Sequence, residues 1–141
     1  PGKLVTKGIL GPADARQAAE PDADAIVVSN HGGRQLDGAP STVEVLPKIA
    51  NAVGDRIEVL FDGGIRSGQD VLKALALGAH GCMIGRSYLY GLGAMGEAGV
   101  RKALDLIAGE LKVSMSLTGV KNIGEVTADI LYDRPGDRGS N

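Results

Sequence analysis

Residues 25–37 constrain the fold of this chain more than any other stretch. The apolar run Ala25-Ile26-Val27-Val28 is followed at once by the polar, glycine-containing turn Ser29-Asn30-His31-Gly32-Gly33-Arg34-Gln35-Leu36-Asp37. Continuous runs rich in Ile and Val are typical of parallel strands that are buried on both faces. Folds built on such sheets place their chemistry where the strands end. The sequence therefore predicts an α/β fold with a candidate functional site in this turn.

His31 and Arg34 are the reactive groups of this turn. An imidazole transfers protons near neutral pH, and a guanidinium binds a carboxylate through two parallel hydrogen bonds. Together they indicate a site that holds a small carboxylic acid and deprotonates a neighbouring group. One His and one Arg do not define a mechanism, and a polar turn with a capping His is the alternative interpretation.

The remaining pattern predicts four βα units. Expected strands cover 3–7, 25–29, 57–61 and 81–84, and expected helices cover 12–19, 41–53, 67–78, 87–92, 97–117 and 122–130. Ser41 and Ser67 each stand three residues before an acidic residue, as in a capping box, while Pro47 predicts a kink or a late helix start. The spacing suits parallel strands with crossover helices, but it supplies half of an eight-stranded barrel. A sheet of only these four strands leaves two apolar strand edges and one uncovered face. We therefore expect the chain to be a fragment, a nicked chain or half of a barrel that pairs with another half.

Composition and single residues add smaller expectations. The chain has 141 residues, of which 43% are hydrophobic, and a net charge of −2 without a basic stripe, so nothing indicates a nucleic-acid partner. Cys82, the only cysteine, is expected to be a buried core thiol in a reducing compartment. His80 is interpreted as structural, and the methionines as core filling. No apolar run long enough to span a membrane and no metal site is expected.

Two more predicted strand ends place glycines and an arginine before a helix. They are Asp62-Gly63-Gly64-Ile65-Arg66 and Gly85-Arg86. Glycines let the backbone approach an anion closely, and a helix N-terminus offers free N–H groups. The loops after the last two strands of α/β barrels often bind phosphate in this way. These turns could also serve only as tight corners, but two in succession favour a phosphate site.

At these residues the chain resembles the FMN-dependent α-hydroxy acid oxidases and dehydrogenases. Residues 28–37 resemble the active-site signature of that family, and the similarity continues through 7–10, 62–66, 73–79 and 85–86, covering about residues 3–131. The resemblance implies an FMN-containing TIM (β/α)8 barrel, of which residues 1–132 supply about strands 5–8, followed by a disordered tail at 133–141. Segments 89–91 and 117–121 are similar to the bacterial L-lactate dehydrogenases, so L-lactate is the expected substrate.

The resemblance also implies a role for each site residue. His31 is expected to act as the base that oxidation of an L-2-hydroxy acid to the 2-oxo acid requires, and Arg34 to bind the substrate carboxylate. Lys7 is expected near flavin N1, Ser29 against the flavin, and Asp62 on the ribityl hydroxyls. The residues expected around the FMN phosphate are Gly63, Gly64, Arg66, Gly85 and Arg86.

The resemblance further implies partners that the chain lacks. Other site residues of the family lie in the N-terminal half of the barrel, so that half is an expected partner and the isolated chain is expected to be inactive. Full-length members form homo-oligomers, a tetramer being the expected form. The expected location is the cytoplasm, including the inner face of the cell membrane. Two alternatives stay open: another FMN- or phosphate-binding barrel enzyme, and a non-catalytic, self-associating half-barrel that binds FMN or phosphate.

Overall fold

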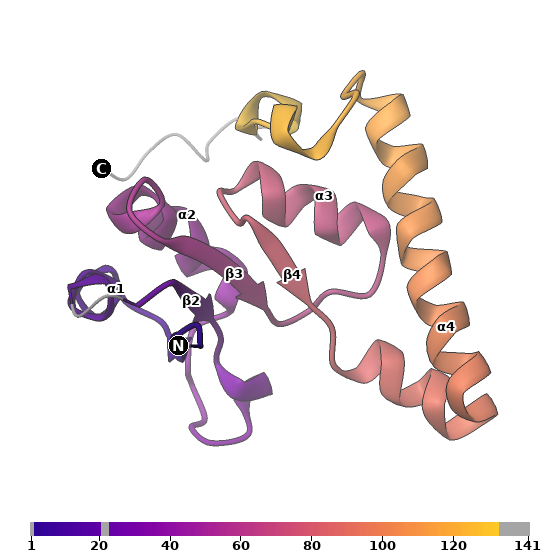
Figure 1. Ribbon diagram of the computed structural model, residues 1–141, viewed down its shortest axis with the longest axis horizontal. Coiled ribbons are helices and arrows are strands. Elements are labelled where there is room, and N and C mark those ends of the chain that lie inside the picture. The colour runs from indigo at the N-terminus through magenta and orange to yellow at the C-terminus, as the bar shows by residue number, and fades with distance from the viewer. Residues whose placement is uncertain (1, 21–22, 133–141) are drawn as a thin grey trace.

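The computed structural model describes residues 2–20 and 23–132, and its centre is a parallel sheet of four strands (Figure 1). The strands are β1 (Val5–Ile9), β2 (Ala25–Val28), β3 (Glu58–Asp62) and β4 (Gly81–Met83), adjacent in chain order. The crossover helices are α1 (Pro12–Ala19), α2 (Thr42–Val53) and α3 (Gly68–Ala76). This architecture confirms the predicted α/β class and its βα units. The predicted disordered tail, 133–141, lies outside the described residues.

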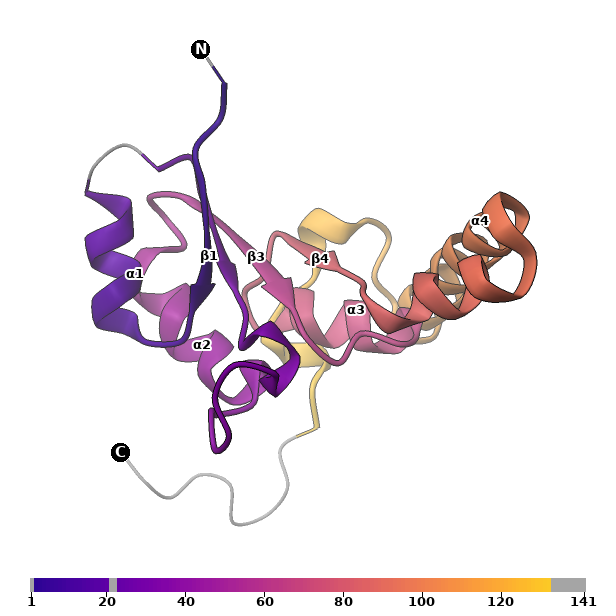
Figure 2. The ribbon, with the colours of Figure 1, turned by 90° about the horizontal axis from the view of Figure 1, so that it is seen from below.

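The three crossover helices cover the same face of the sheet (Figure 2). Ile26, Val59 and Phe61 point to that face and are at most 2% exposed, packed with Leu46 and Ile49 of α2. The opposite face carries Lys7, Val27, Leu60 and Gly81, which are paired across the strands. Consecutive strand residues point to opposite faces, so the helix side of each strand forms the core.

The capping boxes predicted from the sequence are found at the starts of α2 and α3. Ser41 and Ser67 both form capping boxes, with Glu44 and Asp70 respectively. The first box lies at the start of α2, so the helix begins at Thr42 and the predicted late start does not occur. The helix continues through Pro47. The strands begin and end within about two residues of the predicted positions, the usual uncertainty of such boundaries.

The last helix, α4 (Arg86–Leu117), is interrupted where the sequence predicts a gap between two helices. Met95 and Gly96 leave helical geometry, with φ values of −144° and 59°. The two arms touch at a pair of glycines, because a Cβ added to Gly99 would lie 1.8 Å from the carbonyl oxygen of Gly91. The helix predicted at 122–130 is instead two 3-10 turns, η2 (Ile123–Glu125) and η3 (Ala128–Ile130). Gly124, Val126 and Thr127 are weak helix formers, which accounts for the difference.

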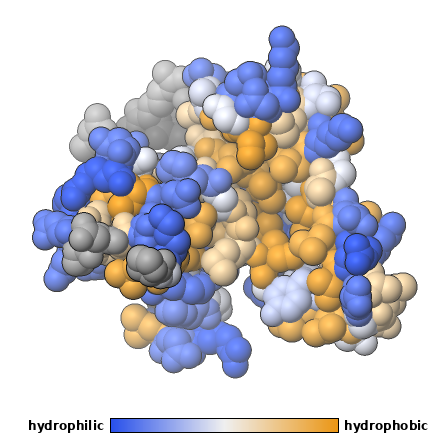
Figure 3. Space-filling model, viewed as in Figure 1, coloured by the Kyte–Doolittle hydropathy of each residue, from blue (hydrophilic) through white to orange (hydrophobic). Residues whose placement is uncertain are grey.

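One face of the sheet and much of α4 carry exposed apolar side chains. Figure 3 shows this hydrophobic surface between the sheet and α4. Large exposed members are Val5, Met83, Leu89, Leu92, Met95, Leu104, Leu106, Val113 and Leu117. The prediction that Met83 and Met95 fill the core is wrong, since one stands on the open face and the other at the break in α4. Among residues 2–20 and 23–132, no helix combines the length and apolar character needed to cross a bilayer.

Two residues singled out from the sequence have structural roles. The Nδ1 atom of His80 accepts a hydrogen bond from the backbone N–H of Val59 at 3.0 Å, which supports the structural interpretation of this histidine. Cys82 is partly buried on the helix side of β4, and burial raises the pKa of its thiol to about 11. A thiol of that pKa is a poor nucleophile, in agreement with a packing role.

Candidate cofactor and substrate site

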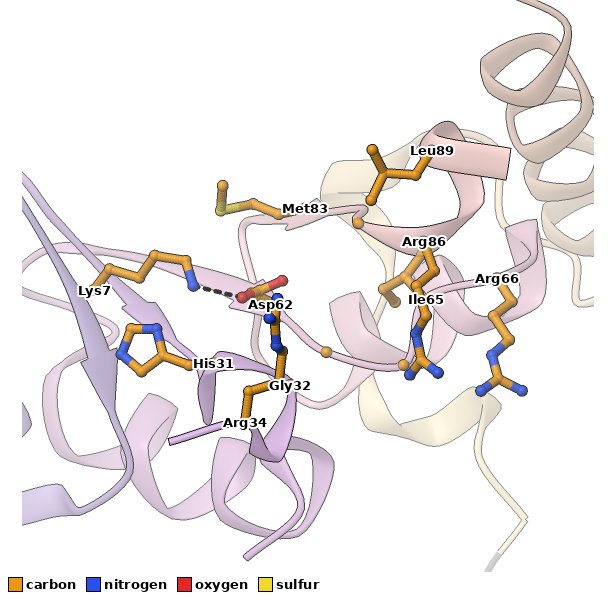
Figure 4. Close-up of a pocket in the computed structure, with 13 residues that line it drawn as sticks. Lys7, His31, Gly32, Arg34, Asp62, Ile65, Arg66, Met83, Arg86 and Leu89 are labelled. Atoms are coloured by element: carbon orange, nitrogen blue, oxygen red, sulfur yellow. Dashed lines mark hydrogen bonds and ion pairs between the residues drawn. The ribbon is translucent and has the colours of Figure 1, made fainter. Parts of the chain in front are cut away.

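A cleft of about 570 Å³ opens at the carboxyl ends of the strands (Figure 4). Of the residues predicted for the site, all except Ser29 line it: Lys7, His31, Arg34, Asp62, Gly63, Gly64, Arg66, Gly85 and Arg86. They come from β1, from the turn after β2, from the end of β3 and the turn that follows it, and from Gly85 and the first residue of α4. Parallel strands end at one edge of the sheet, so residues distant in sequence meet there.

The turn after β2 has an unusual left-handed backbone. His31, Gly32 and Gly33 have φ values of 55°, 70° and 70°, and His31 is the only described non-glycine residue with positive φ. Each of their N–H groups has a local acceptor. Ser29 Oγ accepts from His31 N (3.1 Å), Asn30 Oδ1 accepts from Gly32 N (3.0 Å), and the Asn30 carbonyl accepts from Gly33 N (3.0 Å). The order Ser-Asn-His-Gly-Gly therefore supplies both the acceptors and the conformational freedom that the turn requires.

Lys7, Ser29 and Asp62 form one hydrogen-bonded cluster beside this turn. Lys7 Nζ lies 2.6 Å from Asp62 Oδ2 and 2.7 Å from Ser29 Oγ. The Ser29 hydroxyl donates to Asp62 Oδ2 at 2.6 Å. Ser29 is 0% exposed and lies behind the cleft wall. The cluster thus joins three strand ends through one buried oxygen.

The electrostatics of the cluster favour an ionised Asp62. Burial opposes ionisation of this carboxyl, but hydrogen bonds from Lys7 and Ser29 and the electrostatic effects of Lys7 and His31 outweigh it. The pKa of Asp62 is therefore held below its ordinary value of 3.8. The cleft therefore presents an ionised Asp62 carboxylate near neutral pH, held at 2.6 Å from Lys7 Nζ.

Gly8 makes room for the His31 ring. It has a φ of 99° and stands where the register between β1 and β2 shifts. A Cβ at Gly8 would lie 2.8 Å from His31 Nε2, so a larger residue would displace the imidazole. Within the described part of the chain, the imidazole has no hydrogen-bond partner. Sequence reasoning missed this role of Gly8, although a glycine inside a strand signals a close approach.

The glycines after β3 and β4 are needed either for close packing or for open space in the cleft wall. Gly63 has a φ of 125°, and a Cβ there would lie 2.5 Å from Thr42 Oγ1, so only glycine fits. Gly64 has a φ of 81°, and Cβ atoms added to it or to Gly85 would meet nothing within 4 Å. The backbone of these two turns is thus accessible to a ligand.

Arg66 and Arg86 add positive charge to this end of the cleft. Their side chains extend in the same direction in Figure 4, and both line the cleft. Two guanidinium groups beside open glycine backbone form a suitable site for a phosphate group. Within residues 2–20 and 23–132, no group of three His, Cys, Asp or Glu side chains could hold a metal ion.

The N-terminus of α3 contributes less to anion binding than its sequence predicts. Asp70 Oδ2 accepts hydrogen bonds from the N–H groups of Arg66 and Ser67, both at 3.0 Å. Glu110 Oε2 of α4 accepts from Gly68 N at 2.9 Å. These N–H groups are already paired with carboxylates. By contrast, α4 begins at Arg86 with Gly85 as its N-cap, and no side chain caps its first N–H groups.

Four further residues line the cleft and were not predicted as site residues: Gly32, Ile65, Met83 and Leu89. Met83 pairs in register with Asp62 and so shares its face of the sheet. Leu89 follows Arg86 by one helical turn. These two side chains give the cleft an apolar wall opposite its charged residues (Figure 4). The alternation of β4 and the periodicity of α4 are the signals that could have identified them.

Comparisons with known proteins give consistent results. The profile of the family described as FMN-dependent dehydrogenase matches residues 1–133. An L-lactate dehydrogenase of Caulobacter vibrioides is 58% identical over 133 residues, which cover 94% of this chain and 35% of that protein. An L-lactate dehydrogenase of Pseudomonas aeruginosa is 55% identical over 130 residues, which cover 92% and 34%.

Solved structures of mandelate oxidase show the same architecture. A variant with the monooxide FMN adduct is 52% identical and superposes with a TM-score of 0.86, covering 88% of this chain and 40% of that one. Mandelate oxidase with benzoyl-formic acid gives the same identity and TM-score, with 88% and 37% covered. The chain therefore spans about a third of the length of the curated relatives that it matches.

Proposed function

This chain belongs to the FMN-dependent dehydrogenase family, and we propose that it supplies the C-terminal part of a barrel that binds FMN and oxidises a small L-2-hydroxy acid. L-Lactate is the proposed substrate, because the curated relatives are L-lactate dehydrogenases. One observation carries the proposal: a single cleft brings His31, Arg34 and Lys7 together with the glycine and arginine turns after β3 and β4.

The cleft has the groups that FMN binding requires. The backbone of Gly64 and Gly85 is open, and Arg66 and Arg86 supply charge for the phosphate. The Asp62 carboxylate is ionised and suited to accept hydrogen bonds from ribityl hydroxyls. The cleft volume of about 570 Å³ is ordinary for a cofactor site.

We assign the substrate chemistry to the other end of the cleft. Arg34 pairs with the substrate carboxylate and so orients the acid. His31 accepts the proton that the hydroxy acid loses when it becomes a 2-oxo acid. Lys7, whose Nζ lies 2.6 Å from Asp62 Oδ2, is the residue whose positive charge we assign to the flavin ring when FMN is bound. When bound, FMN supplies the acceptor for the two electrons of the substrate.

A chimera tests this proposal directly. In the Caulobacter L-lactate dehydrogenase, the 133 matching residues of this chain replace the segment that they match, which restores a full barrel. We expect the purified, FMN-loaded chimera to lose its oxidised flavin absorbance when L-lactate is added without oxygen. His31→Gln should slow this reduction at least about a hundredfold, the range expected for a general base. Arg34→Lys should raise KM, since one cation cannot replace a bidentate contact.

The control separates binding from chemistry. His31→Gln should bind FMN as tightly as the parent chimera, because the imidazole is not assigned to the phosphate. A chimera that binds FMN but is reduced equally fast with and without His31 would overturn the proposed role. Reduction by other 2-hydroxy acids and not by L-lactate would retain the reaction class and change the substrate.

A further inference from the structure

Ser29 is the one predicted site residue that does not line the cleft. It is 0% exposed, and it immediately follows the fully buried strand β2. Its hydroxyl accepts hydrogen bonds from Lys7 Nζ at 2.7 Å and from the His31 backbone N–H at 3.1 Å, and it donates one to Asp62 Oδ2 at 2.6 Å. A hydroxyl has one donor and two acceptor sites, so Ser29 uses its full capacity.

We propose that Ser29 is a positioning residue that sets the spacing between Lys7, Asp62 and the main chain of His31. The significance of that spacing for cofactor and substrate rests on the proposed function. The three partners come from β1, the end of β3 and the turn after β2, and Ser29 Oγ is the single atom that contacts all of them. It therefore couples the groups assigned to the flavin to the group assigned to the substrate proton.

Each partner needs an external restraint. Lys7 has a long flexible side chain that is 38% exposed, so its position depends on the contacts of its ammonium group. His31 adopts a left-handed backbone, which is unfavourable for a non-glycine residue, and the hydrogen bond from its N–H to Ser29 Oγ restrains it. Asp62 accepts hydrogen bonds from both Lys7 and Ser29 on the same oxygen, Oδ2.

Most other small residues in place of Ser29 would not form all three of its hydrogen bonds. Alanine leaves the His31 N–H without its acceptor and removes one donor from Asp62. Aspartate places a second carboxylate against Asp62 in a buried position, which is costly. Threonine keeps the hydroxyl, and cysteine keeps the shape but is a weak hydrogen-bonding group.

The test compares Ser29→Ala with Ser29→Thr and with a matched control in the 141-residue chain. Ser114→Ala is the control, because Ser114 is 8% exposed and its hydroxyl donates only to the Glu110 carbonyl within α4. Three quantities are measured: hydrogen exchange of the His31 amide, the pKa of the Asp62 carboxyl by NMR, and the Kd for FMN from flavin fluorescence. The first two need no ligand.

We expect Ser29→Ala to speed exchange of the His31 amide at least about tenfold, to raise the pKa of Asp62, and to weaken FMN binding about tenfold. Ser29→Thr should restore the first two quantities, and Ser114→Ala should change none of the three. If Ser29→Ala does not fold, Ser29→Cys carries the same measurements.

The outcomes separate this inference from the proposed function. Wild-type exchange at His31 and a wild-type pKa at Asp62 in folded Ser29→Ala would overturn the positioning role. If both quantities change in that variant while the unsubstituted chain binds no FMN, the positioning role is supported and FMN binding by this chain is contradicted.

Discussion

At the scale of single residues, the site depends on conformations that few amino acids adopt. His31 has positive φ, its ring lies against Gly8, and its N–H is bonded to Ser29. Strained backbone of this kind persists only where the surrounding structure determines it. The restraints lie in the same nine-residue turn and in β1, so the imidazole is placed by the sheet edge itself.

Asp62 should make the stability of the fold depend on acid pH. Because its pKa in the folded state is below 3.8, its ionisation stabilises the fold above pH 3.8, and this stabilisation is lost as the pH falls through the folded-state pKa. We expect Asp62→Asn to lower the free energy of unfolding at pH 7, and the difference from the wild type to shrink below pH 3.8. Urea unfolding across this range measures both. A difference that is constant with pH would contradict the assignment.

Cys82 should react slowly with thiol reagents in the folded chain. Burial raises its pKa to about 11 from 9.0, which lowers the thiolate fraction at pH 8 about a hundredfold. We expect labelling by iodoacetamide at pH 8 to be at least that much slower than in the denatured chain. Equal rates in native and denatured protein would show that β4 does not protect the thiol.

At the scale of elements, α4 is attached through its contact with α3. A Cβ at Gly68 would lie 1.9 Å from the backbone nitrogen of Leu111, so the two helices approach as closely as backbone atoms allow. The Glu110 side chain reaches across the same contact to the Gly68 N–H. This contact sets the direction of α4, whose N-terminus borders the proposed phosphate end of the cleft.

A pair of glycine substitutions tests this contact. Gly68→Ala should lower the free energy of unfolding by about 1–3 kcal/mol, the usual cost of overpacking. Gly109→Ala is the matched control in α4, because a Cβ there meets nothing within 4 Å; alanine should stabilise this helix by about 0.5–1 kcal/mol. Thermal or urea unfolding measures both. Equal effects of the two substitutions would show that α3 and α4 are not in close contact.

The elements show which features can be predicted from sequence. The capping boxes at Ser41 and Ser67 and the break in α4 at Met95 and Gly96 are local, so residue spacing is sufficient to predict them. The bond from Gly68 N to Glu110 spans 42 positions, and the burial of Ser29 depends on β1 and β3. No local pattern contains such contacts. The sequence therefore predicts most of the residues that line the cleft. The contacts that these residues make with distant parts of the chain can be identified only from the structure.

At the scale of the whole molecule, the sheet is part of a barrel. The outer edges of β1 and β4 have no partner strand among the described residues, and one face of the sheet is not covered by the crossover helices. The relatives are about three times as long as the matched region, since it covers about 35% of them. The exposed apolar side chains of Val5, Met83 and α4 are the surface that we expect the remainder of the barrel to cover.

All residues that we assign to the FMN phosphate belong to this chain. The open glycines and both arginines lie in the turns after β3 and β4. Recognition of the cofactor phosphate is thus the part of the proposed function that the chain should show alone. We expect the proposed substrate site to need residues from the rest of the barrel, because the His31 imidazole has no hydrogen-bond partner within residues 2–20 and 23–132.

The most direct measurement compares the binding of FMN and riboflavin to the 141-residue chain by equilibrium dialysis. The two flavins differ only in the phosphate, so the ratio of their dissociation constants reports the site formed by Gly64, Gly85, Arg66 and Arg86. We predict that FMN binds at least about tenfold more tightly than riboflavin, and that Arg66→Gln with Arg86→Gln removes the difference. Equal binding of the two flavins, or no binding of FMN, would contradict the assignment of this cleft.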